Sequence, residues 1–411
     1  MITEILIKKP LKDHIKPNDI RLYKVNKINV IKGMKKALLY VRVIYHLFKL
    51  AINVYGSFKT AVKALKLLKQ FKVLTMGRSY TKVIKVEQKY YFHLFAPGYP
   101  SKIFDEYILG ELNRVVPISK KTDDLNYLYL AITKKCPLNC EHCFEWDNLN
   151  KKESLELIDL KAIVERFQRE GISQFHLSGG EPMARIKDLN ELILLANKVS
   201  EFYVLTSGFN FTASNAALLK QSGLTGVVIS LDHFDAEKHD AFRGFQNSFD
   251  QVMQAIENAK NQKLVTALTL CATKEFISWE NLIEYAMLAK KQGVVFVQLL
   301  EPKAVGHYKE KEVLLSIKDI NLLDKFYETM NFDKNYEDFP IVIYPGYHQR
   351  KVGCMSGGNR TLYIDSEGYV NACPFCQTKN FNIKNIIDKE NQFMQSIKSS
   401  VCPSVTVTAY N

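Results

Sequence analysis

Several patterns that would mark an unusual architecture are missing from this chain of 411 residues. No segment is of low complexity, and no stretch recurs at the spacing of a solenoid repeat. The N-terminus lacks a charged region followed by an apolar run and a cleavage site, so we expect a cytoplasmic protein in a reducing compartment. Eight cysteines are too few for a disulfide framework in a chain of this length, so clustered cysteines indicate metal ligands. The hydrophobic content of 47% is enough for a sizeable core.

Acidic residues are scarce in the first 85 positions, which contain 20 Lys or Arg and only 3 Asp or Glu. This local excess is +17, so the net charge of +13 leaves the remainder of the chain at −4. Hydrophobic periodicity predicts two amphipathic helices here, over 33–55 and 57–73, each with a basic stripe. Arg42, His46 and Lys49 interrupt the longer apolar run on one face, which argues against a membrane-spanning helix.

Three roles remain open for the basic segment 30–75. Its lysines suit an anionic membrane surface, with the helices lying in the interface. Alternatively, both apolar faces pack on the rest of the protein and leave the lysines in solvent. The third role is binding of an acidic partner, although we expect no nucleic acid.

A regular alternation of strand-like and helix-like patterns begins near residue 124. Helical patterns such as those over 154–170 and 250–262 separate six apolar runs. Such alternation predicts an α/β fold with a parallel sheet and helices outside, either flat or curled into a partial barrel. The predicted strands cover 127–133, 174–177, 202–205, 226–231, 264–272 and 294–300. Near the end, 361–364 and 369–372 flank a turn that contains Gly368 and predict a β-hairpin in a separate small module.

Three cysteines, Cys136, Cys140 and Cys143, lie within eight residues directly after the first predicted strand. Thiolates this close on one loop can bind a single metal centre. A cubane iron–sulfur cluster takes one thiolate per iron, so three cysteines leave one iron open for another ligand. Zinc is the alternative, but a zinc site normally has a fourth nearby ligand, for which His142 is the only local candidate.

The spacing C-x3-C-x2-C followed by an aromatic residue, Phe144, resembles the radical S-adenosylmethionine (SAM) superfamily. The resemblance implies a partial (β/α)6 barrel and a [4Fe–4S] cluster whose open iron binds the amino and carboxylate groups of SAM. It also implies that an electron, supplied by a donor such as flavodoxin or ferredoxin, cleaves SAM to a 5′-deoxyadenosyl radical that takes hydrogen from a substrate. The cofactors carry this chemistry, while the protein positions them and excludes water.

Later segments match further motifs of this superfamily. Gly179-Gly180-Glu181-Pro182 matches its Gly-Gly-Glu-Pro motif, in which glycines allow close backbone approach and Glu181 offers a carboxylate to the methionine ammonium. Thr206-Ser207-Gly208 resembles its Thr-Asn-Gly turn, with Ser207 in place of Asn. Ser230, Asp232 and Arg243 follow the pattern of one large subgroup, which implies that Ser230 contacts SAM and that Arg243 pairs with its carboxylate. Without a cofactor role, Ser207 and Ser230 would be polar strand ends and Arg243 part of a surface salt bridge.

The remaining C-terminal cysteines are Cys354, Cys373, Cys376 and Cys402. Their spacing around Gly368 resembles the opening of the SPASM module, or its shortened Twitch form, which carries auxiliary iron–sulfur clusters. A full SPASM module has seven cysteines, so the four here imply one auxiliary [4Fe–4S] cluster. A structural zinc held by four thiolates is the alternative. Cys271, inside the fifth predicted strand, is expected to be an inert core residue.

These patterns divide the chain into a basic extension (1–120), a radical SAM partial barrel (121–335) and a SPASM/Twitch-like module (336–411). By analogy with SPASM-type relatives, we expect modification of a peptide or protein side chain. One alternative is a lipid or lipid-linked metabolite, with the protein peripheral on the inner membrane face. The other is a non-catalytic iron–sulfur or zinc protein. Catalytic residues are not identified, and Asp232, His233 and Cys271 are the candidate hydrogen donors near strand ends.

Overall fold

The computed structural model describes residues 28–78, 81–118, 125–195, 199–354, 360–377, 379 and 381–385. Within them, one open sheet has the strand order β12-β11-β10-β3-β4-β5-β6-β7-β8-β9, and a hairpin, β1-β2, stands apart from it. The strands are β1 (Ile84–Val86), β2 (Lys89–Tyr91), β3 (Tyr127–Ala131), β4 (Gln174–Ser178), β5 (Glu201–Thr206), β6 (Gly226–Ser230), β7 (Val265–Cys271), β8 (Phe296–Leu300), β9 (Ile341–Ile343), β10 (Thr361–Ile364), β11 (Tyr369–Asn371) and β12 (Phe381–Asn382). The predicted α/β fold is confirmed, and the barrel is partial because the described sheet does not close on itself.

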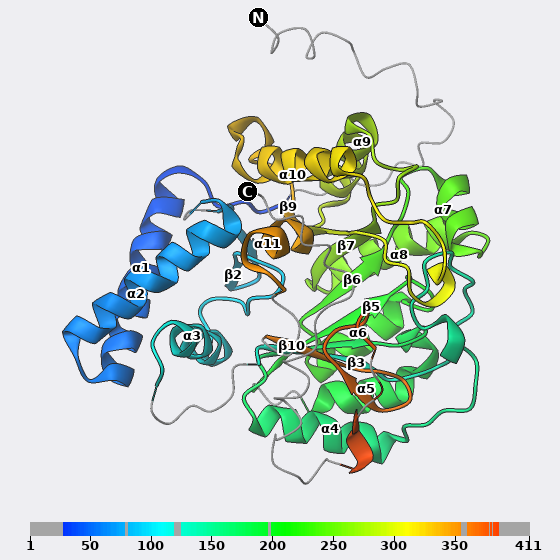
Figure 1. The fold of residues 1–411 in the computed structure, drawn as a ribbon, viewed down its shortest axis with the longest axis horizontal. Helices are drawn as coiled ribbons and strands as arrows, with labels where there is room; N and C mark the ends of the chain where they lie inside the picture. The colour runs from blue at the N-terminus through cyan, green and yellow to red at the C-terminus, as the bar shows by residue number, and fades with distance from the viewer. Residues whose placement is uncertain are drawn as a thin grey trace, which may run out of the picture.

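Helices lie on the outer side of this sheet and beside it (Figure 1). They are α1 (Gly33–Tyr55), α2 (Phe58–Met76), α3 (Lys102–Val115), α4 (Leu157–Arg169), α5 (Ile186–Leu194), α6 (Ala213–Ser222), α7 (Ala236–Arg243), α8 (Ser248–Asn261), α9 (Trp279–Gln292), α10 (Ile317–Phe332) and α11 (Pro345–Val352). The two predicted helices of the extension are therefore present as α1 and α2, and α3 lies between them and the barrel in the sequence.

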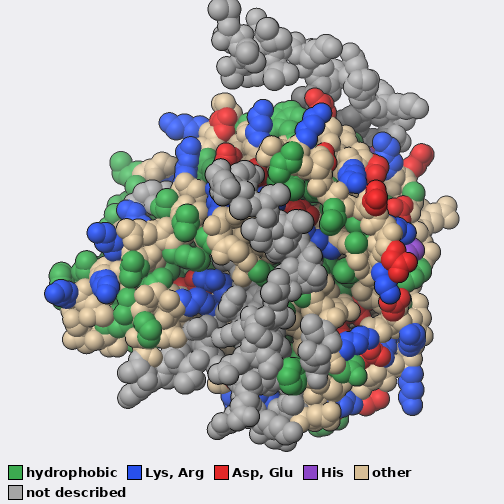
Figure 2. Space-filling model, viewed as in Figure 1, with side chains coloured by type: hydrophobic (Ala, Val, Ile, Leu, Met, Phe, Trp, Pro, Cys, Tyr) green, Lys and Arg blue, Asp and Glu red, His purple; other side chains and the backbone are tan. Residues whose placement is uncertain are grey.

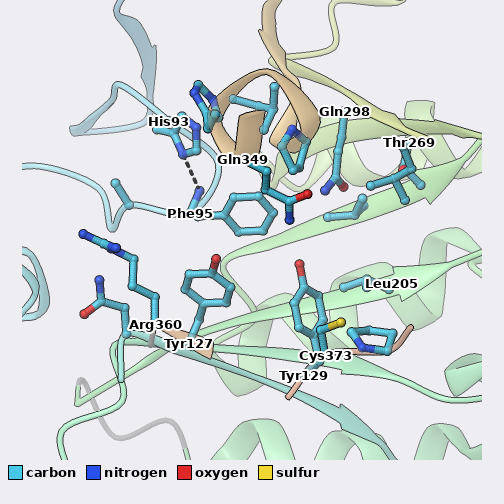
Figure 3. A pocket seen from close by; sticks show the side chains of 18 of the residues that line it. His93, Phe95, Tyr127, Tyr129, Leu205, Thr269, Gln298, Gln349, Arg360 and Cys373 are labelled. Atoms are coloured by element: carbon cyan, nitrogen blue, oxygen red, sulfur yellow. Dashed lines mark hydrogen bonds between the residues drawn. The ribbon is translucent and has the colours of Figure 1, made fainter. Parts of the chain in front are cut away.

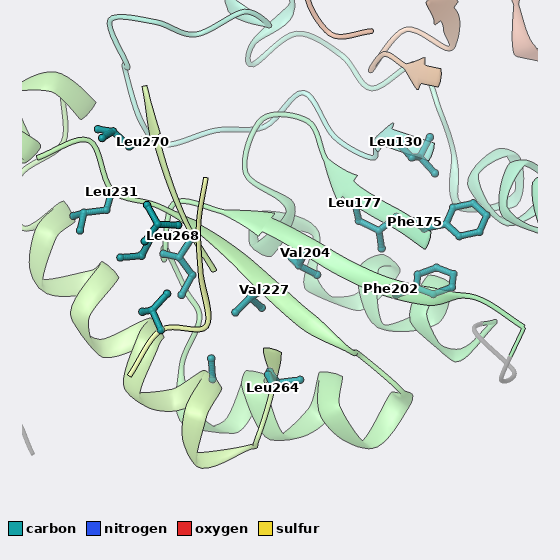
Figure 4. Packing of buried hydrophobic residues seen from close by; sticks show 14 of the residues in the cluster. Leu130, Phe175, Leu177, Phe202, Val204, Val227, Leu231, Leu264, Leu268 and Leu270 are labelled. Carbon is teal, nitrogen blue, oxygen red and sulfur yellow. The ribbon is translucent and has the colours of Figure 1, made fainter. Parts of the chain in front are cut away.

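The six predicted strands are β3 to β8, which are parallel and follow one another in chain order. Alternate side chains of a strand point to opposite faces of the sheet. Figure 3 shows the inner face, where Tyr129, Thr269 and Gln298 lie along a cavity. Figure 4 shows the outer face, where side chains such as Leu177 and Val227 pack in the main hydrophobic core under the helices. The inner face is therefore the more polar one and is available to a ligand.

The sheet is larger than the sequence predicted. β9 adds to β8 in parallel, and β10 adds to β3 in parallel at the other side. The predicted C-terminal hairpin is confirmed, since β10 and β11 pair antiparallel and Gly368 has a φ of 90°. It does not stand apart as a separate module, because four residues of β10 pair with β3. This pairing covers an edge of β3 that would otherwise expose its backbone hydrogen-bonding groups.

The hairpin β1-β2 packs against the inner face of the half-barrel. Ile84 and Tyr91 belong to one cluster of buried residues with Tyr203, Phe296 and Ile341. Those three residues lie at or near the amino ends of β5, β8 and β9. The hairpin therefore fills the half-barrel at the amino ends of the strands, and the space that remains lies toward their carboxyl ends.

Helices α1, α2 and α3 form a layer at one side of the half-barrel (Figure 1). Their shared core contains Leu39, Val43, Ala61 and Phe104. Glu111 of α3 joins this layer to the barrel, because its carboxylate accepts hydrogen bonds from Asn126 at 2.7 Å and from Arg360 at 3.2 Å. Burial alone would raise the pKa of Glu111, but the guanidinium groups of Arg360 and Arg114 hold it below its ordinary value.

The basic stripe of α1 is not simply exposed to solvent. His46 Nε2 lies 2.7 Å from Asp105 Oδ1 of α3, and the guanidinium of Arg42 lies 6.0 Å from the ring centre of Tyr99. One apolar face of α1 is exposed instead, with Met34 at 80% and Val41 at 66% exposure. Figure 2 shows hydrophobic and basic side chains next to one another over this layer. By length and composition alone, α1 could also cross a membrane.

Candidate functional site

A cavity of about 990 Å³ extends from the carboxyl ends of the parallel strands to the layer of α1, α2 and α3. Carboxyl ends of parallel strands are where ligands usually bind in such folds. The motif residues that line the cavity are Cys136, Cys140, Cys143, Phe144, Gly179, Gly180, Glu181, Thr206, Ser207, Ser230, Asp232 and Arg243. Of the predicted cofactor residues, Pro182 alone does not line it; this proline is buried as the first residue of a 3₁₀ helix, Pro182–Arg185.

The cysteine loop is held from two sides by segments far away in the sequence. Asn139 N donates a hydrogen bond of 3.0 Å to the Arg243 carbonyl at the end of α7. On the other side, His307 N donates to the Cys143 carbonyl and His307 Nδ1 lies near the Cys140 carbonyl, both at 2.9 Å. Because these contacts use the backbone, they fix the loop and leave the three thiols toward the cavity.

The residues present fit a four-iron cluster. Arg243 Nη1 lies 3.6 Å from Cys140 Sγ, so a cation is in place beside a thiolate ligand. A Cβ on Gly180 would lie only 2.3 Å from the Lys135 carbonyl oxygen, so this glycine permits the close approach of the two loops. In the described part of the chain, no three His, Cys, Asp or Glu side chains are placed to hold one metal ion. In a cubane, each thiolate binds a different iron, so the ligands need not meet at one point.

Burial raises the pKa of Cys136 and of Cys143 to about 12. Both thiols are therefore protonated at neutral pH in the absence of a metal. Binding of iron releases these protons, because the thiolate is the ligand.

Glu181 connects the ends of two strands. Its carboxylate accepts hydrogen bonds from Ser207 N at 2.7 Å, Ser207 Oγ at 2.6 Å, Thr206 Oγ1 at 2.7 Å and Met183 N at 3.0 Å. Burial raises the pKa of Glu181 above its ordinary value, while these four bonds favour the charged form. The Gly-Gly-Glu-Pro and Thr-Ser-Gly segments are thus one structural unit, and the contact of Glu181 with a methionine ammonium stays a prediction.

Arg243 is buried and pairs with Asp232, with Nη2 2.6 Å from Oδ2. The alternative of a surface salt bridge is therefore wrong. The other oxygen of Asp232 accepts a hydrogen bond of 2.9 Å from Cys271 N. Burial alone would raise the pKa of Asp232, but the Arg243 guanidinium holds it below its ordinary value. Pairing of Arg243 with the SAM carboxylate stays a prediction.

The three candidate hydrogen donors are placed differently. Asp232 and Cys271 both line the cavity, and Cys271 is buried in its strand, as predicted for a core residue. His233 does not line it, and its Nδ1 accepts a hydrogen bond of 2.9 Å from Asp235 N. Of the three candidate hydrogen donors, Asp232 and Cys271 therefore lie at the cavity and His233 does not.

The C-terminal cysteines lie near β3 as far as the structure describes them. Cys373 lines the cavity close to Tyr129, and Cys354 lies near Tyr127. Cys376 N donates a hydrogen bond of 3.1 Å to the Cys373 carbonyl. Cys402 lies outside the described residues, so its part in an auxiliary cluster stays a prediction.

Gly306 is a site residue that the sequence analysis missed. It has a φ of 56°, and a Cβ on it would lie 2.2 Å from the Cys143 carbonyl oxygen. The neighbouring His307 ring stacks on Trp146, with ring centres 3.8 Å apart. A glycine in the loop after the sixth predicted strand was the available signal, but a lone glycine in a loop is too common to be distinctive.

Comparison with known proteins agrees with this geometry. A model described as "Radical SAM superfamily" matches residues 130–286, which contain the cysteine loop, Glu181 and Arg243. The chain therefore contains a radical SAM domain. It is a radical SAM enzyme, and the class uses a [4Fe–4S] cluster and SAM, as the cysteine motif predicted.

Two curated relatives of this radical SAM chain have different names and activities. GTP 3',8-cyclase of Aquifex aeolicus (strain VF5) is 26% identical over 294 residues, which cover 67% of this chain and 89% of the relative. Mycofactocin maturase MftC of Mycolicibacterium smegmatis is 27% identical over 276 residues, which cover 62% of this chain and 66% of the relative. Among solved structures, Streptococcus suis SuiB bound to S-adenosylmethionine has a TM-score of 0.55 at 15% identity and covers 83% of this chain and 80% of SuiB. This last likeness shows the shared fold.

Proposed function

We propose that this radical SAM enzyme abstracts a hydrogen atom from a peptide or protein side chain held in the cavity. The observation that carries the proposal is one continuous cavity, which joins the cysteine loop and the SAM motifs to an apolar groove between α1, α2 and α3. Such a groove suits the apolar side chains of a peptide. The relative named as mycofactocin maturase and the structure of SuiB with its precursor peptide SuiA support a peptide substrate.

The bound cluster and SAM supply the 5′-deoxyadenosyl radical, and the chain supplies position and shielding. Phe144 packs edge-to-face on Tyr363 and Phe375, with ring centres 5.9 Å apart in each pair, which covers the cysteine loop with apolar rings. Exclusion of water matters because a carbon radical reacts with whatever hydrogen donor reaches it. The substrate must therefore enter from the groove side.

Two further parts belong to this proposal. Cys354, Cys373, Cys376 and Cys402 hold an auxiliary [4Fe–4S] cluster in the C-terminal segment 336–411, whose strands β9 and β10 continue the sheet of the barrel. A cytoplasmic electron donor such as flavodoxin or ferredoxin reduces the radical SAM cluster. The position of Cys373 on the cavity wall supports a cluster close to the substrate.

The test is an anaerobic incubation of the reconstituted protein with SAM and dithionite. We expect 5′-deoxyadenosine, measured by liquid chromatography and mass spectrometry; none above the no-enzyme background would overturn the enzyme assignment. For the substrate, a short precursor peptide encoded beside the gene is synthesised with deuterated side chains. Deuterium in 5′-deoxyadenosine supports a peptide, and no transfer from any such peptide contradicts it.

The exposed apolar face of α1 favours a second candidate, a lipid or lipid-linked substrate taken from an anionic membrane. Met34, Leu38, Val41 and Tyr45 recur at helical spacing and are all more than half exposed. Exposed lysines flank them, which is the composition of a helix that lies in a membrane interface. The cavity reaches this layer at Ile44 and Val62, both partly exposed. The protein would then be peripheral on the inner membrane face.

We expect the double variant Val41→Glu and Tyr45→Glu to lose binding to anionic vesicles. Two charges on the apolar face oppose its burial among acyl chains, at a cost of several kcal/mol. The measurement is flotation of the full chain with phosphatidylglycerol and phosphatidylcholine vesicles. Ile158→Glu is the matched control, since Ile158 is 74% exposed on α4, outside this layer. Equal flotation of the double variant, or none by the wild type, contradicts the membrane proposal.

A further inference from the structure

Three basic side chains from separate parts of the chain meet at the cavity: Lys72 of α2, His93 of the loop after β2, and His348 of α11. The rings of His93 and His348 have centres 6.3 Å apart. Burial, together with His348 and Lys72 nearby, lowers the pKa of His93 to about 3. The three groups are therefore close neighbours in a space that repels further positive charge.

In each of the two histidine rings, Nδ1 forms a hydrogen bond and Nε2 forms none in the described part of the chain. His93 Nδ1 accepts a bond of 3.2 Å from Phe95 N, drawn as a dashed line in Figure 3, so the ring proton is assigned to Nε2. His348 Nδ1 lies 2.8 Å from the Thr75 carbonyl, to which it donates. The Nε2 atoms of both rings are buried and have no hydrogen-bond partner among the described residues. Buried polar atoms are normally paired, so these two indicate a missing ligand.

Lys72 likewise has no carboxylate at ion-pair distance within the described chain, and burial lowers its pKa to about 8. The acidic residues that line the cavity are already engaged. Glu111 is bound to Arg360, Asp232 to Arg243, and Glu301 to Arg350 at 2.6 Å. The other two acidic lining residues are held by hydroxyl groups, Glu145 by Ser366 at 2.9 Å and Glu181 by Thr206 and Ser207. Negative charge for Lys72 therefore has to come from a bound molecule.

The walls beside this cluster are apolar. Val43 and Leu47 of α1 and Val62, Leu65 and Leu68 of α2 line the same cavity. Lys69 and Lys66, about one and two turns before Lys72, are exposed on the same wall. A ligand that suits both features carries an apolar chain and an anionic group.

We propose that Lys72, His93 and His348 bind the phosphate group of an amphiphilic substrate whose apolar chain lies in the groove of α1 and α2. A phosphate monoester that keeps one proton fits these three groups. Its oxygens accept from the Lys72 ammonium and from His93 Nε2–H, and its P–OH donates to His348 Nε2, which carries no proton because Nδ1 donates to the Thr75 carbonyl. The inference rests on the second candidate of the proposed function, radical chemistry on a lipid-linked substrate, and assigns the anionic group of that substrate to this part of the cavity.

The probe is decyl phosphate below its critical micelle concentration, titrated calorimetrically into the reconstituted full chain under anaerobic conditions. Lys72→Met should weaken its binding about tenfold or more, since a buried charge-assisted hydrogen bond is lost. Decanol, which lacks the anion, should bind both proteins equally. Lys63→Met is the control, because Lys63 is exposed on α2 and does not line the cavity.

Lys72→Arg separates charge from packing, and we expect it to bind decyl phosphate far better than Lys72→Met does. Equal losses in both variants, or no binding by the wild type, overturn the proposal. Decanoate that binds as tightly as decyl phosphate overturns the phosphate assignment in favour of a carboxylate. Formation of 5′-deoxyadenosine without substrate is measured in parallel. Decyl phosphate binding without SAM cleavage would refute the proposed function alone, and the converse would refute this subsite alone.

Discussion

Replacement of Cys136, Cys140 and Cys143 by alanine is expected to abolish 5′-deoxyadenosine formation completely. The three thiols line one wall of the cavity, on a loop whose backbone is bound to Arg243 and His307. Without them no protein ligand holds the iron to which SAM binds, so the loss falls on the first step of the reaction. The measurement is anaerobic turnover with SAM and dithionite, compared with the wild type at equal protein concentration.

Iron analysis of the same triple variant tests the C-terminal cysteines. We expect about eight irons in the reconstituted wild type and about four in the variant, since each cubane contains four. Cys271→Ala is the control for the iron count, because Cys271 is buried in β7 and has no predicted part in a cluster. No iron in the triple variant contradicts the auxiliary cluster, and stoichiometric zinc would support the structural alternative.

The local features of the site could be predicted because they depend on neighbouring residues. Cys136, Cys140 and Cys143 share one short loop, and Glu181 follows the next strand in the parallel sheet. The alternation of strands and helices therefore predicted that the cysteine loop and Glu181 lie at the same edge of the sheet. Gly368 was predictable for the same reason, since a tight turn between two strands requires its positive φ.

Features that depend on distant contacts could not be predicted. The pairing of β10 with β3 joins residues far apart in the sequence, and no local pattern in Thr361–Ile364 distinguishes a sheet strand from a separate hairpin. The exposed face of α1 is a similar case. Periodicity showed that the helix is amphipathic, but His46 binds Asp105 of α3 and so turns part of the basic stripe inward.

The grouping of Lys72, His93 and His348 also had no signal in the sequence. His348 lies 273 positions after Thr75, and the hydrogen bond that orients its ring goes to the Thr75 carbonyl of α2. Such a cluster exists only because α11 packs on α2. Binding sites made of single residues from separate elements therefore need the structure.

Gly306→Ala is expected to lower 5′-deoxyadenosine formation by about 10²-fold or more, the cost of displacing a reacting centre by about 1 Å. A Cβ on Gly306 would lie 2.2 Å from the Cys143 carbonyl oxygen and 2.6 Å from Phe144 Cα. Both are backbone atoms, so no side-chain rotation relieves the contact and the cysteine loop has to move. Iron content should fall toward four, since Cys143 is displaced while the C-terminal cysteines are not.

Gly171→Ala separates this contact from backbone strain. Gly171 has a φ of 86°, and nothing lies within 4 Å of the position its Cβ would take. Both variants place alanine in the left-handed region, at a cost of about 1–2 kcal/mol, so both should unfold at lower denaturant concentration. We expect Gly171→Ala to keep its iron and its SAM cleavage. Equal activity of the two variants would show that the loop after β8 does not hold the cluster in place, and that strain alone accounts for the effect of Gly306→Ala.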